Sequence, residues 1–100
     1  MYNKLVRDRI PEVIEASGAH IRTRILNDDE NLQSLIEKLA EEYEEFKEVV
    51  NIEELADLQE VILALADVVA SREELEKVRA DKAAKRGAFT KKIFLESVDE

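Results

Sequence analysis

The sequence contains no cysteine and a single histidine, His20, among its 100 residues. Without cysteine the chain has no disulfide framework, no thiolate ligand for a metal and no thiol nucleophile. One histidine also excludes a zinc site built from several imidazoles. Any metal in this protein would therefore be held by oxygen ligands.

Long hydrophobic runs are also missing. The apolar run at residues 61–70 is interrupted by Asp67 and is shorter than the roughly 20 residues that span a bilayer. The first residues lack the apolar core of a secretion signal. The sequence therefore predicts a soluble, cytoplasmic protein with no membrane partner. Its length predicts a single domain over residues 1–100.

Positive charge is scarce in the middle of the chain, whose net charge is −9. Residues 28–76 carry three basic against seventeen acidic side chains, whereas residues 1–27 carry five against three and residues 77–100 seven against four. This distribution argues against binding a nucleic-acid polymer, which needs a continuous basic face. It suits metal ions held in the middle and phosphates bound from the ends, although acidic helices can also serve solubility alone.

Helix-start signals recur along the chain. Three times an Asn or Ser is followed three residues later by Glu, the pattern of a capping box. These signals predict three helices, at about residues 27–50, 51–70 and 71–87. Pro11 suits the first turn of a shorter helix that ends before Gly18.

Two further segments have strand-like composition. Residues 20–26 alternate apolar or β-branched with basic residues, and residues 89–95 centre on an Ile-Phe-Leu run. They predict two short strands near the termini. The expected fold is mainly α, a helical bundle with these two strands.

Four carboxylates fall on or beside the apolar faces of the first two long helices. At about 100° per residue, Glu42 lies inside the apolar arc of the first helix and Glu45 just beyond its edge. In the second helix Glu54 lies near the middle of the arc and Asp57 at one edge. Glu41 projects to the opposite, solvent side. Burying such charges is costly unless a partner neutralises them.

The two pairs of carboxylates share one geometry. Each has i, i+3 spacing, which places both side chains on one face of a helix. If the chain reverses near Asn51, the helices are antiparallel and the four groups converge on one volume. Four carboxylates suffice for one or two Mg²⁺ ions, with Mn²⁺ as an alternative. Taken singly, Glu54 also fits as a capping glutamate, and Glu45 as the partner of a surface lysine.

The acidic pattern resembles a known enzyme superfamily. Glu-Glu-x-x-Glu at residues 41–45, followed by Glu-x-x-Asp at residues 54–57, resembles the signature of the all-α nucleoside triphosphate pyrophosphohydrolases. These include the MazG proteins, the dimeric dUTPases and phosphoribosyl-ATP pyrophosphohydrolase. Residues 2–11 and 82–89 are similar to a small MazG-like, phosphoribosyl-ATP pyrophosphohydrolase-like branch. The resemblance covers nearly the whole chain.

The resemblance implies an activity and a set of metal ligands. The activity is hydrolysis between the α and β phosphates of a nucleotide, releasing a nucleoside monophosphate and pyrophosphate, with Mg²⁺ or Mn²⁺. The implied ligands are Glu42, Glu45, Glu54 and Asp57. Glu41 matches the first glutamate of the motif, although its outward position argues against a direct metal role. The linker between the motifs is shorter than in many relatives, so the base of the substrate stays open.

General-base and phosphate-binding residues can be ranked on the same hypothesis. Glu45 or Glu41, if not used in coordination, would accept the proton of the attacking water beside the metal ligand Glu42. The outer phosphates need basic partners, and the candidates in order of preference are Lys82, Lys85 and Arg86, then Lys4, Arg7 and Arg9. The first three share one helix face, but cations near a helix C-terminus are also favoured by the helix dipole alone.

The wide apolar arcs predict self-association. Two long helices from each of two chains would form a four-helix bundle, giving a homodimer or a homotetramer. The expected role is nucleotide-pool housekeeping. The alternatives are a true phosphoribosyl-ATP pyrophosphohydrolase of histidine biosynthesis, or a non-catalytic acidic helical module for interaction or nucleotide binding.

Overall fold

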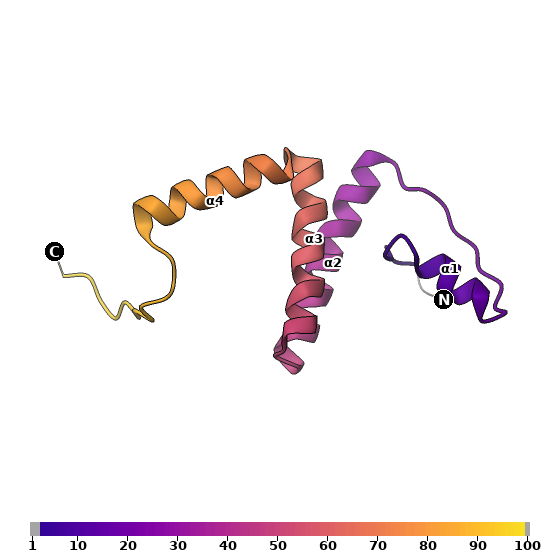
Figure 1. Ribbon diagram of the computed structural model, residues 1–100, viewed down its shortest axis with the longest axis horizontal. Coiled ribbons are helices and arrows are strands. Elements are labelled where there is room, and N and C mark those ends of the chain that lie inside the picture. The colour runs from indigo at the N-terminus through magenta and orange to yellow at the C-terminus, as the bar shows by residue number, and fades with distance from the viewer. Residues whose placement is uncertain (1–2, 100) are drawn as a thin grey trace.

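The computed structural model describes residues 3–99, and this range contains four α-helices and no strand (Figure 1). The helices are α1 (Ile10–Ala16), α2 (Asp28–Glu48), α3 (Ile52–Val69) and α4 (Arg72–Arg86). The prediction of a mainly α protein is confirmed. None of the helices within residues 3–99 combines the length and the low polarity needed to cross a bilayer.

Side-chain caps begin the three long helices where the sequence places them. At α2, Asn27 Oδ1 accepts a hydrogen bond from the Glu30 backbone N–H at 2.9 Å, and the Glu30 carboxylate accepts the Asn27 N–H at 3.2 Å. Asn51 and Ser71 accept the corresponding bond at the starts of α3 and α4, at 2.8 and 3.0 Å. Each bond satisfies a backbone donor that has no partner within the helix.

Glycines follow two of the helices. Gly18, beyond the end of α1, and Gly87, the C-cap of α4, have φ of 93° and 83°. Residues with a side chain disfavour positive φ, so glycine is the residue that commonly ends a helix in this conformation. The predicted helix ends are therefore confirmed.

The two predicted strands are wrong. Residues 20–26 and 89–95 are irregular and largely exposed, and they lie far apart along the long axis of the molecule in Figure 1. A strand needs a neighbour for its backbone N–H and C=O groups. Neither segment has one within residues 3–99, so the side-chain pattern alone did not produce a strand.

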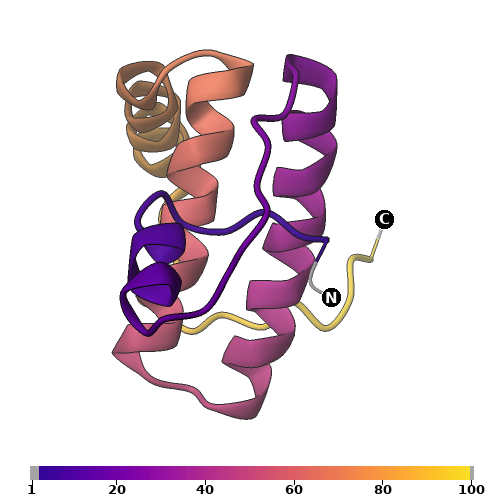
Figure 2. The ribbon, with the colours of Figure 1, turned by 90° about the vertical axis from the view of Figure 1, so that its right-hand side faces the viewer.

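The core lies between α2 and α3, which form an antiparallel hairpin joined at residues 49–51 (Figure 2). The hydrophobic side chains that are buried among the described residues are Leu35, Val61 and Ala66. Helix α4 contacts α3 only near their junction and points away from the hairpin (Figure 1). The radius of gyration is 18.0 Å, against about 13 Å for a compact chain of this length. One chain alone therefore leaves much of its apolar surface exposed.

Candidate metal centre

Three carboxylates meet on the α2–α3 hairpin. Glu42 of α2 and Glu54 and Asp57 of α3 each offer an oxygen, and these three oxygens lie within 4.8 Å of one another. The packing of α2 against α3 in the antiparallel hairpin brings them together. Three of the four predicted metal ligands are thus adjacent. A set of three carboxylates, with no nitrogen or sulfur donor, suits a hard divalent cation.

Glu42 is the buried member of this group, with 8% of its surface exposed. Its Oε1 lies 3.7 Å from Lys38 Nζ, whereas its Oε2 is buried and has no hydrogen-bond partner within residues 3–99. Glu54 Oε2 is also buried without a partner in this range. Buried oxygens of this kind are unfavourable until a donor or a cation satisfies them.

The surroundings raise the pKa of Glu42 above its ordinary value. Burial is the main cause, and the neighbouring carboxylates of Glu45 and Asp57 add to it, while the Lys38 ammonium acts in the opposite direction. The negative potential at this point is therefore only partly compensated by the protein. A bound cation would favour the ionised form.

Glu45, the fourth predicted ligand, borders the group. Its carboxylate is close enough to Glu42 to raise the pKa of that residue, but its oxygens lie outside the set of three and its side chain is exposed. This position leaves Glu45 free of the tight cluster and in contact with solvent.

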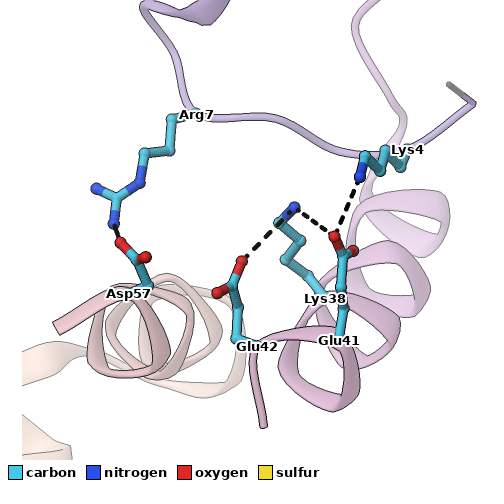
Figure 3. A network of polar contacts seen from close by, with 6 residues as sticks. All are labelled: Lys4, Arg7, Lys38, Glu41, Glu42 and Asp57. Atoms are coloured by element: carbon cyan, nitrogen blue, oxygen red, sulfur yellow. Dashed lines mark hydrogen bonds and ion pairs between the residues drawn. The ribbon is translucent and has the colours of Figure 1, made fainter. Parts of the chain in front are cut away.

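Lys38 was not among the predicted site residues. Its side chain is 17% exposed, and its Nζ lies 3.4 Å from Glu41 Oε1 as well as 3.7 Å from Glu42 Oε1 (Figure 3). Lysines three and four residues before an acid on one helix commonly reach it. This spacing in the sequence could have identified Lys38 as a partner of the two glutamates.

An N-terminal arm, residues 3–9, crosses the hairpin in front of the carboxylates (Figures 2 and 3). Lys4 Nζ lies 3.1 Å from Glu41 Oε1 on α2, and Arg7 Nη2 donates to Asp57 Oδ1 on α3 at 2.6 Å. Glu41, expected on the solvent side, is half-buried, and its carboxylate is contacted by both Lys4 of the arm and Lys38 (Figure 3). The hydrogen bond from Lys4 is the main reason that the pKa of Glu41 is lowered.

The six basic residues predicted to bind phosphates fall into three groups. Lys4 and Arg7 contact the acidic residues directly, whereas Arg9 pairs with Glu12 at 3.3 Å on the exposed surface. Lys82, Lys85 and Arg86 are exposed on the half of α4 that points away from the hairpin (Figure 1). Within one chain the first-ranked candidates are therefore remote from the carboxylates and two of the second-ranked ones adjoin them.

Comparison with known proteins assigns no family. No family model matches the chain, and no solved structure matches it. Over 44 residues the chain is 52% identical to an uncharacterized protein of Mycolicibacterium smegmatis, a stretch that covers 44% of this chain and 45% of that protein. The chain thus spans less than half the length of this relative, whose name carries no activity.

Proposed function

We propose that this protein is a Mg²⁺- or Mn²⁺-dependent nucleoside triphosphate pyrophosphohydrolase. The observation that carries the proposal is the meeting of Glu42, Glu54 and Asp57 within 4.8 Å, with buried oxygens of two of them lacking a partner among the described residues. The choice of reaction rests on the motifs that resemble those of the MazG-like enzymes. Water attacks the α phosphorus, the bond from that phosphorus to the bridging oxygen breaks, and pyrophosphate leaves.

The side chains divide the work between binding and proton transfer. Glu42, Glu54 and Asp57 would hold the metal, which neutralises phosphate charge and lowers the pKa of bound water. Glu45 is the better general base, because it lies outside the tight group and next to it. Glu41 is engaged by Lys4 and Lys38, which lower its pKa and make it a weaker base.

A second copy of the chain would complete both the core and the phosphate site. An apolar hollow runs along α3, lined by Ile52, Leu55, Ala56, Leu58, Gln59 and Ile62. This surface fits a homodimer, or a homotetramer built from two such dimers. In such an assembly the basic end of one α4 would reach the acidic hairpin of another copy, bringing Lys82, Lys85 and Arg86 to the phosphates. The opposite charges of the two segments favour this contact.

Pyrophosphate release tests the proposal. The purified protein is incubated with ordinary and modified nucleoside triphosphates and with phosphoribosyl-ATP, at several concentrations of Mg²⁺ and Mn²⁺. We expect metal-dependent release from at least one substrate. Preference for phosphoribosyl-ATP would identify the biosynthetic enzyme, and preference for another nucleotide the housekeeping one.

Two aspartates of α3 provide a matched pair of variants. Asp57→Asn removes a proposed metal ligand. Asp67→Asn removes another carboxylate of α3, one that pairs with Arg72 of α4 at 3.1 Å. Loss of one ligand should reduce turnover by at least about a hundredfold, and the control should retain it. Absence of pyrophosphate under every condition would favour a non-catalytic helical module. Equal turnover in the two variants would instead overturn the proposed role of Asp57 as a metal ligand.

A further inference from the structure

We infer that the N-terminal arm regulates the metal centre by exchanging partners: Lys4 and Arg7 hold carboxylates in the metal-free protein and transfer to phosphate oxygens when metal and triphosphate bind together. This inference rests on the proposed function. It goes beyond that function because it makes metal binding and nucleotide binding depend on each other.

The arm is the right length to connect the two helices. Lys4 and Arg7 are three residues apart, which in an extended chain spans about 10 Å. Packed helices lie about 8–10 Å apart. One cation of the arm therefore pairs with each helix, Lys4 with α2 and Arg7 with α3, on either side of Glu42 (Figure 3).

The arm carries one partly buried apolar side chain between its two cations. Leu5 between the two cations is half-buried, as are Ile10 and Ile14 of the adjoining helix α1. Figure 2 shows the arm crossing the hairpin, whereas α1 makes no close contact with another helix within the described residues. Lys4 and Arg7 can change partners by turning their long side chains while the backbone stays where it is.

Arg7 competes with a metal for Asp57. The Arg7 guanidinium donates a hydrogen bond to Asp57 Oδ1 at 2.6 Å, and Asp57 belongs to the three-carboxylate group. A divalent cation in that group would meet a fixed positive charge beside it, since arginine stays protonated at all working pH values. A metal ion alone must therefore displace Arg7 or tolerate its repulsion, and binds weakly in either case.

A triphosphate removes this conflict. Phosphate oxygens accept paired hydrogen bonds from a guanidinium, so Arg7 released from Asp57 gains a strong new partner. Lys4, released from Glu41, gains one too. Because each ligand removes an obstacle to the other, metal and triphosphate should bind with positive coupling, and the coupling is equal in both directions.

The first test measures Mn²⁺ alone, by following free Mn²⁺ with electron paramagnetic resonance during titration of the full chain. Arg7→Gln should bind Mn²⁺ about two- to fivefold more tightly than wild type, the effect expected for removing a half-exposed ion pair. Arg79→Gln is the matched control, because Arg79 forms a similar exposed pair with Glu76 at 2.6 Å on α4. It should bind Mn²⁺ as wild type does.

The second test measures a triphosphate whose α and β phosphorus atoms are joined by methylene, which cannot be cleaved there. At saturating Mn²⁺ its affinity should fall about tenfold in Arg7→Gln, the loss expected for a charge-assisted hydrogen bond. Arg7→Lys should recover part of it. A variant that is merely damaged would weaken both ligands, whereas partner exchange gives opposite signs for metal alone and for nucleotide.

The outcomes separate the two proposals. If wild-type protein binds no Mn²⁺, the metal centre fails and the inference falls with it. If wild type binds Mn²⁺ but Arg7→Gln binds it equally or more weakly, the arm does not compete and only the inference is overturned. Unchanged nucleotide affinity in Arg7→Gln would overturn it as well.

Discussion

Lys38 Nζ lies 3.7 Å from Oε1 of Glu42, one turn further along α2, and leaves the other carboxylate oxygen of Glu42 buried without a partner within the described residues. Lys38 thus compensates the charge at one oxygen of the buried Glu42 carboxylate. The other oxygen is available to a ligand. Such a group is unfavourable for the metal-free fold and useful only when something binds to it.

Glu42→Gln should therefore stabilise the metal-free protein at neutral pH while abolishing turnover. The folded-state pKa of Glu42 is raised, so the stability that the protonated form contributes is lost as pH rises through that pKa. Glutamine imitates the protonated form at every pH. We expect a gain of about 1 kcal/mol at pH 7, vanishing below the ordinary glutamate value.

Thermal unfolding with a chelator, at pH 7 and pH 4, measures this effect. Glu48→Gln, on the exposed side of the same helix, is the control and should change little. A less stable Glu42→Gln protein at pH 7 would mean that the Lys38 pair already compensates the charge.

A second pH dependence arises at the start of α2. Hydrogen bonds from Arg24, and then from the Asn27 backbone, hold the pKa of Glu30 at about 2. Because this folded-state pKa is lowered, the stability it contributes is full above the ordinary glutamate value and is lost as pH falls through about 2. Glu30→Gln should therefore flatten the loss of stability between about pH 4.5 and pH 2.

Circular dichroism melts across that window test the Glu30 prediction. Glu60→Gln serves as the control, because Glu60 is exposed on α3 and has no ion pair within residues 3–99. If both variants lose stability with the same pH profile as wild type, the capping carboxylate does not set the acid response.

The features that the sequence predicted are local ones. Asn27 and Glu30 are three residues apart, and their bonds form within one turn, so the helix start follows from spacing alone. The positions of the carboxylates on α2 and α3 follow from helical periodicity in the same way. Apart from Lys38, whose ion pairs are local, the features that were missed join distant residues: Lys4 reaches Glu41 across 37 positions and Arg7 reaches Asp57 across 50.

The direction of α4 could not be predicted from the sequence pattern either. It is set at Ala70, whose φ of −159° and ψ of −92° turn the chain away from the hairpin before Ser71 begins the next helix. Helical periodicity places Lys82 and Arg86 on one face but gives no information about where that face points. The strand predictions failed for a related reason, because a strand depends on a partner that composition cannot supply.

Ile62→Asp tests whether the apolar face of α3 is covered by a second copy. Ile62 lines the hollow on α3 and is 39% exposed in the single chain. A charge in such an interface should raise the dissociation constant at least tenfold, since loss of a buried apolar side chain costs about 1.5–3 kcal/mol. Sedimentation should show a shift towards monomer together with a lower melting temperature.

Ile25→Asp is the matched control for this experiment. Ile25 is 95% exposed in the loop before α2 and lies outside the hollow, so the same substitution should leave the assembly unchanged. A wild-type protein that stays monomeric at all concentrations would contradict self-association and leave the basic end of α4 without access to the carboxylates.

Mixing two inactive variants tests whether the basic end of α4 serves the other subunit. Asp57→Asn lacks a metal ligand, and the double variant Lys82→Ala, Arg86→Ala lacks phosphate-binding cations. In a mixed dimer whose sites are shared between subunits, each site takes its carboxylates from one subunit and its α4 cations from the other. One site then carries both defects, whereas the other has intact carboxylates and intact cations. Random exchange makes half of the dimers mixed, so about one quarter of wild-type activity should return. If each chain used its own α4, every site would keep one defect and the mixture would stay inactive.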